Sequence, residues 1–126
     1  RVEVARELAG TTGCGVLLKG LPSVVAAPDG VVLIDSQCTS ALASAGMGDV
    51  LTGVCGSFLA QGVESAAVAG GLGLYHSGRA AVVADHGPGL TPEDVVDHLS
   101  RVLGESGMGV TDLDLPFVVY DQDPPR

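Results

Sequence analysis

The spacing of hydrophobic residues changes along the first third of the chain, and the changes predict its first elements. Residues 1–12 have the three- and four-residue spacing of an amphipathic helix. Residues 15–20 form a short, continuous apolar run, which is typical of a buried strand of the parallel type. Residues 23–27 and 31–34 are runs rich in β-branched residues on either side of Pro28-Asp29-Gly30, and this pattern predicts a β-hairpin. The apolar stripe of the expected first helix consists of Val2, Ala5, Leu8 and Ala9.

The second half of the chain has the pattern of three consecutive helices, after a polar loop over residues 35–40. The first helix follows a glycine-rich segment and ends near Gln61-Gly62. Its expected apolar side consists of Val50, Leu51, Val54, Phe58 and Leu59. The second, from about residue 64 to 85, has small residues on nearly every face and should pack closely against its neighbours. The third should start with Thr91 as its N-cap and Pro92 in the first turn, and end near residue 104.

This order of elements predicts an α/β fold that is incomplete by itself. A parallel sheet needs several strands joined by crossover helices, whereas the pattern contains one buried strand and a hairpin. The chain also opens inside a helical pattern with no capping residue before Arg1. We therefore expect residues 1–104 to be the C-terminal part of a larger α/β domain. Residues 105–126 should form an acidic, solvated C-terminal extension with one strand-like piece, 117–120, that packs through Phe117 and Tyr120.

Composition narrows the possible partners. A length of 126 residues with 46% hydrophobic residues suits one domain, and a net charge of −9 argues against nucleic acid and anionic membranes. The longest apolar stretch, 66–84, is interrupted by His76 and Arg79, so no membrane span is expected. The three cysteines show no C-x-x-C spacing and no zinc pattern with the three histidines, so we expect reduced thiols in a cytoplasmic protein and no metal held by side chains alone.

The segment 43–53 carries the clearest chemical signal of the chain. Gly46 and Gly48 are followed at once by Asp49 and then by an apolar helical run. A helix N-terminus has unpaired N–H groups and a partial positive charge, and glycines let an anion such as phosphate reach the backbone. A carboxylate beside a phosphate points to a metal ion or to proton transfer, which together indicate phosphoryl-transfer chemistry. The plainer interpretation of Asp49 is an acid that stabilises the helix dipole.

Cations are scarce, which restricts how a phosphate could be held. Lys19 is the one lysine of the sequence, and the five arginines form no cluster. A bound phosphate would therefore depend on backbone N–H groups, the helix dipole, Mg²⁺ or Lys19 itself. The alternative for Lys19 is a lysine at the end of a strand whose ammonium reaches solvent.

Taken together, several segments in the same order resemble one family. They are 16–23, 28–30, 41–53, 60–62, 75–78 and 89–91. The series is similar to the ADP/ATP-dependent NAD(P)H-hydrate dehydratases, which are ribokinase-like enzymes that repair hydrated nicotinamide cofactors. The resemblance covers roughly residues 1–104 and implies the C-terminal portion of a ribokinase-like three-layer fold. It also implies a lyase that phosphorylates the 6-hydroxyl of (6S)-NADHX or NADPHX and eliminates phosphate to restore NADH or NADPH.

The resemblance also implies roles for individual residues. Lys19, Gly20, Leu21, Pro22 and Ser23 would bind the nucleotide together with Gly48, and residues 46–48, including Gly46 and Met47, would hold its phosphate. Asp49 would face the hydrated nicotinamide and accept the proton of its hydroxyl. ADP or ATP with Mg²⁺ would supply the phosphoryl group, and the sequence does not decide between the two donors. We expect a homo-oligomer that binds NAD(P)HX as its small-molecule substrate.

Two departures from the family pattern affect this interpretation. The loop before Ala41 has Cys38-Thr39-Ser40 where the family usually has a Gly-Asn pair, so the nucleotide contacts of this loop are not predicted. The resemblance starts inside the family's domain, so we expect the N-terminal half of the domain to lie outside residues 1–126 and these residues alone to be inactive. Two other functions stay open: a ribokinase-like kinase of a small vitamin-precursor alcohol, and a non-catalytic nucleotide-binding fragment.

The remaining candidates receive structural interpretations. His76 lies in the small-residue helix, and a hydrogen-bonded structural role is expected for it. Glu93 and Asp94 are explained as acids in a first helical turn. For His86 and His98 the sequence indicates neither a partner nor a role.

Overall fold

The computed structural model describes residues 1–37, 39–107 and 117–120. The elements in chain order are α1 (Val2–Thr12), β1 (Val16–Leu18), β2 (Val24–Ala26), β3 (Val32–Asp35), the 3₁₀ turn η1 (Ser40–Ala43), α2 (Met47–Ala60), α3 (Ala66–Ala84), the 3₁₀ turn η2 (Gly87–Gly89), α4 (Pro92–Gly107) and β4 (Phe117–Tyr120). This is the predicted order of helix, strand, hairpin and consecutive helices. In the described part of the chain, no helix is long and apolar enough to cross a membrane.

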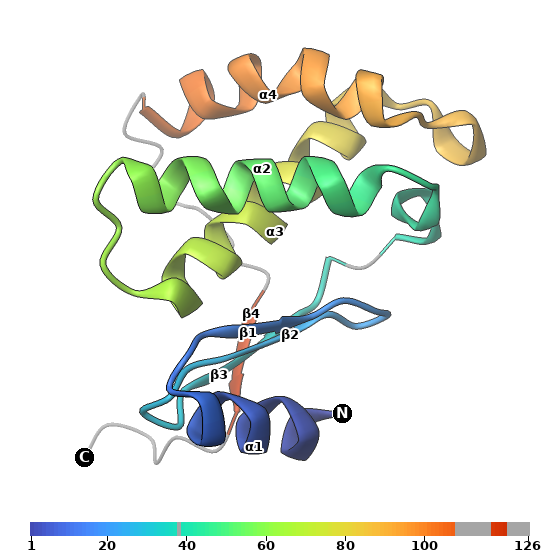
Figure 1. Cartoon of the computed structure of the whole chain (residues 1–126). Coiled ribbons are helices and arrows are strands. Elements are labelled where there is room, and N and C mark those ends of the chain that lie inside the picture. The colour runs from blue at the N-terminus through green and yellow to red at the C-terminus, as the bar shows by residue number, and fades with distance from the viewer. Residues whose placement is uncertain (38, 108–116, 121–126) are drawn as a thin grey trace.

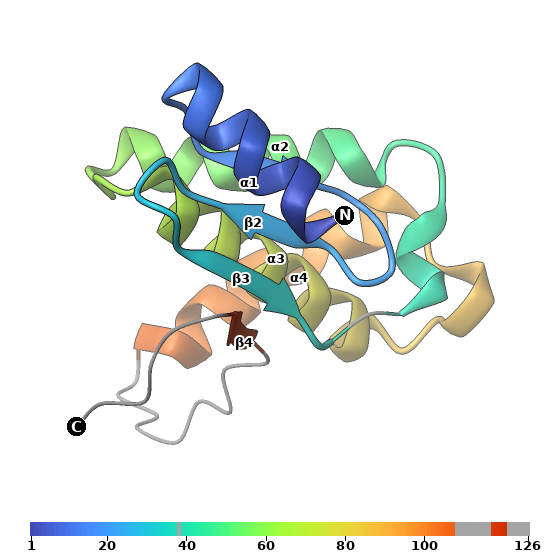
Figure 2. The ribbon, with the colours of Figure 1, turned by 90° about the horizontal axis from the view of Figure 1, so that it is seen from below.

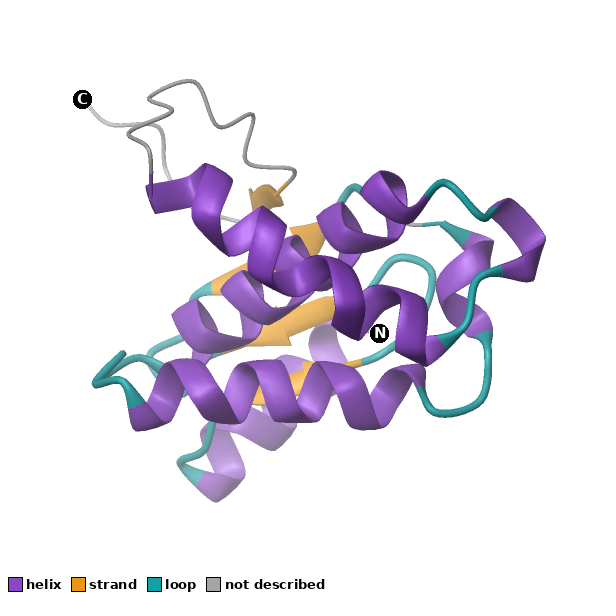
Figure 3. Ribbon diagram, turned by 90° about the horizontal axis from the view of Figure 1, so that it is seen from above, coloured by secondary structure: helices purple, strands orange, loops and turns teal. Residues whose placement is uncertain are grey.

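The elements form layers around the sheet. Helix α1 packs on one face of the sheet, against β1 and β2, and α3 packs on the opposite face (Figure 1). Seen from below, α1 lies in front of the strands and the other helices lie behind them (Figure 2). Helices α2 and α4 both pack on α3, farther from the sheet, as the view from above shows (Figure 3). Helix α3 is therefore the layer that joins the sheet to the outer helices.

The sheet has the order β1-β2-β3-β4 and every neighbouring pair is antiparallel. The predicted hairpin is confirmed: Val24 pairs with Ile34, and the turn is closed by the Ala27 N–H, which donates to Val31 O at 2.8 Å. Gly30 in this turn has φ 95°, a conformation that glycine adopts without strain. The hairpin thus supplies the two central strands of the sheet.

The prediction of a parallel-type strand at residues 15–20 is wrong. Residues 16–18 pair antiparallel with β2 across a connection of five residues, and a parallel pair needs a crossover of a dozen residues or more. The apolar run has another cause. Helix α1 contacts β1 from one face of the sheet and α3 contacts it from the other, so both faces of this strand are covered. The run is apolar because helices pack on both faces of the strand, and not because the strand is parallel to its neighbour.

The apolar stripes of α1 and α2 were predicted too wide. On α1, Ala5 and Ala9 are buried, whereas Leu8 is 49% exposed. On α2, Met47 and Val54 are buried, whereas Leu59 is 47% exposed. Ala5 and Ala9 of α1 and Val54 of α2 are confirmed as core residues, whereas Met47 was not predicted. One flanking leucine of each helix lies on the surface, because a single neighbouring layer covers only part of a helix.

The predicted close packing of α3 is confirmed. A Cβ added to Gly70 would lie 3.1 Å from Val25 Cγ1 of the sheet. A Cβ added to Gly73 would meet Cys55 Sγ of α2 and would lie 3.5 Å from the Cys55 backbone nitrogen. Farther along α3, Ala80 and Ala84 are buried in one cluster with Val95 of α4. Small residues thus let α3 touch three different layers.

Helix α4 extends one turn beyond the predicted end. Glu105 in its last turn accepts from Arg101 Nε at 3.3 Å and forms an ion pair with Arg79 of α3 at 3.7 Å. These contacts stabilise residues 105–107, the start of the expected acidic extension, as the last turn of the helix. The predicted strand at 117–120 is present as β4, where the ring of Tyr120 lies under the Arg6 guanidinium, 5.5 Å from Cζ to the ring centroid. The rest of the predicted extension lies outside the described residues.

The start of α4 is fixed by a small polar cluster. Asp94 Oδ2 accepts from the Thr91 hydroxyl at 2.7 Å and from the Thr91 N–H at 2.8 Å, and it lies 3.1 Å from His86 Nδ1. Thr91 Oγ1 in turn accepts from the Asp94 N–H, which is the reciprocal arrangement of a capping box. The sequence indicated no partner for either histidine; besides the contact of His86 with Asp94, His98 Nδ1 lies 2.7 Å from the Asp94 carbonyl oxygen.

We predict that Gly73→Ala destabilises the protein, because the added methyl group meets Cys55 at a helix crossing that cannot widen freely. Overpacking of this kind lowers the free energy of unfolding by about 1–3 kcal/mol. Gly53→Ala in α2 is the matched control, because a Cβ there meets nothing within 4 Å. It should raise the free energy of unfolding by about 0.5–1 kcal/mol. Urea unfolding of both variants checks this, and equal stability of the two would contradict it.

A second prediction concerns Asp94. Hydrogen bonds from the Thr91 side chain and backbone, together with His86, lower the pKa of Asp94 from 3.8 to about 2. A carboxyl pKa that is lower in the folded state stabilises the fold above pH 3.8, and this stabilisation is lost as the pH falls toward 2. Thr91→Ala removes the largest cause and should raise the pKa of Asp94 toward 3.8, as measured by NMR titration of the side-chain carboxyl. Ser100→Ala on the same helix should leave that pKa unchanged.

Candidate functional site

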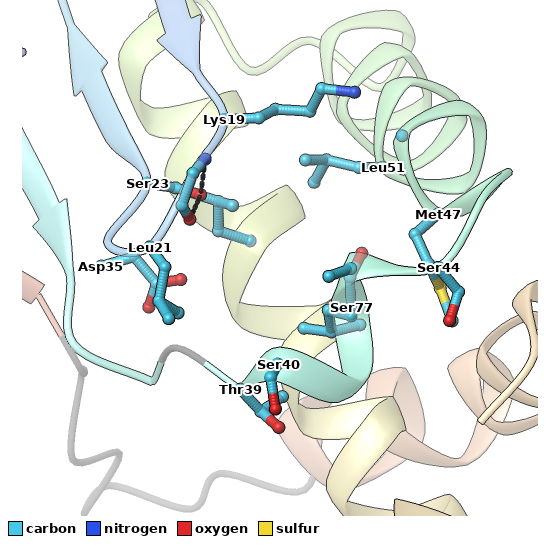
Figure 4. Close-up of a pocket in the computed structure, with 15 residues that line it drawn as sticks. Lys19, Leu21, Ser23, Asp35, Thr39, Ser40, Ser44, Met47, Leu51 and Ser77 are labelled. Atoms are coloured by element: carbon cyan, nitrogen blue, oxygen red, sulfur yellow. Dashed lines mark hydrogen bonds between the residues drawn. The ribbon is translucent and has the colours of Figure 1, made fainter. Parts of the chain in front are cut away.

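A cavity of about 450 Å³ lies between the sheet and the N-terminal ends of η1 and α2 (Figure 4). Five segments contribute to it: the β1–β2 loop, the end of β3, the turn η1 with the residues after it, the first turns of α2, and the middle of α3. Its lining consists of Lys19, Gly20, Leu21, Ser23, Asp35, Thr39, Ser40, Leu42, Ala43, Ser44, Met47, Gly48, Leu51, Leu74 and Ser77. The volume falls in the range of sites for small molecules and cofactors.

One end of the cavity carries positive charge. The Lys19 ammonium lies against Gly48, so that a Cβ added to Gly48 would meet Lys19 Nζ. Within the described residues Lys19 forms no ion pair, and the Gly48 N–H, in the first turn of α2, donates to no other group. A free ammonium and a free helix-start N–H in one place can attract and hold an anion. The resemblance implied that Lys19 and Gly48 serve the same nucleotide, and the fold brings the two residues into contact.

The backbone before α2 explains why glycine precedes this site. Gly46 is the N-cap of α2 with φ 88°, and its carbonyl accepts from the Asp49 N–H at 3.0 Å and the Val50 N–H at 3.2 Å. A Cβ at this position would also lie 3.0 Å from Pro92 Cγ. Gly46 itself does not line the cavity. It turns the chain so that Met47 and Gly48 do.

The β1–β2 loop is held by its own hydrogen bonds. Ser23 is buried, and its hydroxyl accepts from the Gly20 N–H at 3.3 Å and donates to the Gly20 carbonyl at 3.1 Å. Arg1 Nη2 donates to the Lys19 carbonyl at 2.7 Å and to the Leu18 carbonyl at 3.3 Å. These contacts fix the backbone from which the Lys19 side chain extends. Pro22 lies in this loop but not in the cavity lining.

The cavity also contains an acidic residue that the sequence analysis left in a polar loop. Asp35 ends β3, is 8% exposed, and its Oδ1 accepts from the Gln37 N–H at 2.9 Å. Burial raises the pKa of Asp35, and the hydrogen bond from Gln37 opposes this shift. A buried acid in a cavity is a candidate for function. The signal was present in the sequence, since an aspartate directly follows the apolar run 31–34.

Ser77 of α3 is the second residue that the sequence did not indicate as functional. It is 7% exposed and lines the cavity, and its hydroxyl has no hydrogen-bond partner in the described part of the chain. A buried hydroxyl without a partner costs about 1–3 kcal/mol. Its neighbour His76 has the structural role that was expected: the ring is buried, and Nδ1 lies 2.8 Å from the Leu72 carbonyl.

Asp49 lies apart from the cavity lining. It follows Gly48 in the first turn of α2, its side chain is exposed, and it has neither a hydrogen bond nor an ion pair through that side chain among the described residues. A carboxylate in this position is free to accept a proton from a second molecule beside the cavity. No three His, Cys, Asp or Glu side chains of the described ranges are grouped to hold a metal.

Comparison with known proteins identifies the family. A family model described as NAD(P)H-hydrate dehydratase matches residues 1–101. A bifunctional NAD(P)H-hydrate repair enzyme of Mycobacterium leprae is 40% identical over 107 residues, which is 82% of this chain and 23% of that protein. The protein of the same description from Salinibacter ruber is 42% identical over 109 residues, 83% of this chain and 20% of its own length. An ADP-dependent (S)-NAD(P)H-hydrate dehydratase of Neisseria meningitidis is 39% identical over 85 residues, 68% of this chain and 29% of that protein.

The chain therefore spans about a fifth to under a third of the length of these relatives. The family match, by contrast, covers most of the chain, from residue 1 to residue 101. It includes the β1–β2 loop, the end of β3 and the start of α2, which together form most of the cavity lining. The chain belongs to the NAD(P)H-hydrate dehydratase family.

Proposed function

We propose that the protein containing this chain dehydrates (6S)-NADHX or NADPHX to NADH or NADPH with a nucleotide as phosphoryl donor, and that the cavity binds this nucleotide. The observation that carries the proposal is the free Lys19 ammonium against Gly48 at the start of α2. A phosphate there would meet a lysine charge, an unpaired N–H and the positive end of a helix dipole. In a chain with a net charge of −9, such a cationic position favours an anionic ligand.

Asp49 is proposed as the group that receives the proton. As the substrate hydroxyl oxygen forms its bond to the donor phosphorus, the bond from that phosphorus to the rest of the nucleotide breaks. The hydroxyl proton leaves at the same time, and a carboxylate within hydrogen-bond reach can take it. In the second step the C6–O bond breaks and phosphate departs with its electron pair, while C5 loses a proton and the C5–C6 double bond forms. An exposed carboxylate beside the phosphate site suits a base that serves a second substrate.

Mg²⁺ fits this site as an ion that arrives with the nucleotide. The described side chains form no metal-binding group of their own, and Mg²⁺ is commonly held by substrate phosphates, water and one or two carboxylates. Asp49 is the carboxylate of this chain nearest in sequence to the phosphate position. When bound, Mg²⁺ neutralises charge on the transferring phosphoryl group.

The same proposal includes the fold of the whole domain, the phosphoryl donor, the cellular location and the oligomeric state. We propose that residues 1–104 are the C-terminal part of a ribokinase-like three-layer domain and that further strands are supplied by other parts of the protein. ADP is the expected donor, because the Neisseria meningitidis relative is described as ADP-dependent. A cytoplasmic location and a homo-oligomer are proposed on the same family basis. The 126 residues alone are proposed to be inactive.

We predict that Gly48→Ala weakens ADP binding to the full-length protein by about tenfold or more. The added methyl group would occupy the position of the Lys19 ammonium and would cover the free N–H. Since the atom it meets is the end of a flexible side chain, the fold should be kept. Gly53→Ala, in the same helix and with nothing near its Cβ, is the matched control and should bind ADP like the wild type. Calorimetric titration measures both, and equal affinity of the two variants would exclude the phosphate position.

We also predict that Asp49→Asn lowers the rate of NADH recovery from NADHX and ADP by about 100-fold or more, the usual contribution of a general base. ADP affinity should change little, because Asp49 does not line the cavity. Asp97→Asn on α4 serves as the control for loss of one surface charge. A rate within a few-fold of wild type would exclude Asp49 as the base. Phosphorylation of a vitamin-precursor alcohol without NADH recovery would favour the alternative small-molecule kinase.

A further inference from the structure

Helices α2 and α4 begin next to each other, at the same end of the helical layers (Figure 1). Their starts differ, since α2 begins after Gly46, which has no side chain to cap it, whereas α4 begins with the capping box of Thr91 and Asp94. We infer that the capped start of α4 positions the uncapped start of α2, so that Thr91 and Asp94 are positioning residues for the phosphate site. The part of this inference that concerns ADP rests on the proposed function.

Residues 90–92 contact the turn that leads into α2. The Ser44 hydroxyl donates to the Leu90 carbonyl at 3.4 Å, and a Cβ added to Gly46 would lie 3.0 Å from Pro92 Cγ. Met47 and Leu90 are buried in the same hydrophobic cluster. The turn is thus held by a hydrogen bond, by the nearby proline ring and by shared burial, and all three come from a segment much later in the chain.

The capping box in turn fixes residues 90–92. Asp94 Oδ2 accepts from both the N–H and the hydroxyl of Thr91, which is the residue between Leu90 and Pro92. His86, on the other side of η2, lies 3.1 Å from the same carboxylate oxygen. The chain before and after η2 is therefore tied to one side chain. This arrangement fixes the direction of the Leu90 carbonyl and of the Pro92 ring, the two groups that face the turn before α2.

A capping side chain on α2 itself would conflict with the proposed phosphate site. Such a side chain accepts from the N–H of the second or third helical residue. In α2 the second helical residue is Gly48, whose N–H donates to no other group in the described part of the chain. A serine or aspartate at position 46 would occupy the N–H that a phosphate needs. Support from α4 fixes the turn from outside and leaves this N–H open.

Thr91→Ala and Ser65→Ala, made in the full-length protein, separate positioning from stability. Each removes the side-chain cap of one helix, since Ser65 Oγ accepts from the Val68 N–H at the start of α3. Ser65 does not line the cavity, and both variants should lower the melting temperature by a few degrees. Thr91→Ala alone should weaken ADP binding, by about threefold to tenfold, because affinity falls with the fraction of molecules whose turn is in position.

Calorimetric titration with ADP, well below both melting temperatures, distinguishes the two roles. If the box only stabilises α4, Thr91→Ala will bind ADP with the Kd of the wild type, as Ser65→Ala should, and the inference is overturned. Thr91→Ser keeps the hydroxyl that accepts from the Asp94 N–H and should restore the Kd of the wild type. A serine variant as weak as the alanine variant would contradict the role of the hydroxyl.

Pro92→Ala tests the connection between the box and the turn. It removes the ring next to Gly46 and leaves Thr91 and Asp94 in place. ADP binding should again be weakened. In the double variant with Thr91→Ala the loss of affinity should be smaller than the product of the two single losses, because both changes act through the same contact. A loss equal to the product would show independent effects and would exclude this connection.

Hydrogen exchange of the unliganded full-length protein tests the positioning without a ligand. Thr91→Ala should speed the exchange of amides in segment 44–50, and Ser65→Ala should not. Unchanged exchange in this segment would overturn the inference, even if ADP binding fell. Absence of ADP binding and of NADH recovery in the wild type would reject the proposed function, and the exchange data would still decide whether α4 positions the turn.

Discussion

The close approach of α3 to the sheet on one side and to α2 on the other determines the positions of the other layers. Gly70 lies against Val25 and Gly73 against Cys55, and neither position has room for a larger side chain without movement. Because α3 has glycines at these contacts, α2 comes near enough to the sheet for its first turn to face the β1–β2 loop. Lys19 can then reach Gly48, although the two belong to different layers. Larger side chains at Gly70 and Gly73 would move the layers apart and separate Lys19 from Gly48.

The same constraint explains the polarity of the cavity. Helix α3 contributes its middle residues to one wall, including Ser77, and packs on β3, whose last residue is Asp35. The start of α2 contributes the positive end. The cavity thus has the Lys19 ammonium at one place and the buried Asp35 carboxyl at another, each supplied by a different layer.

The sequence predicted the elements better than their relations. The hairpin around Pro28-Asp29-Gly30 and the small-residue helix followed from local turn chemistry and composition. The direction of the strand at 16–18 could not be predicted in this way. An apolar run indicates that both faces of a strand are buried, but it does not indicate whether the neighbouring strand is parallel or antiparallel. Segment 46–48 and Lys19 were recognised from motifs and assigned to one nucleotide site through the family resemblance, whereas Asp35 and Ser77 were missed. Both residues line a cavity that forms only when α3 packs on β3. The spacing of residues along the chain does not show which segments pack together in space.

The position of Asp49 gives the last step of this argument. A carboxylate beside Lys19 and Gly48 would repel a phosphate held there unless a metal ion lay between them. On the exposed side of the first α2 turn, the Asp49 carboxylate is adjacent in sequence to Gly48, which lines the cavity, and yet lies outside the lining itself. Under the proposed function, a phosphoryl group held at Gly48 would lie near Asp49, the proposed base for the hydroxyl of the other substrate. Two consecutive residues of one helical turn thus serve two tasks in the proposed function, and the hydroxyl-bearing substrate is expected on the exposed side of this turn.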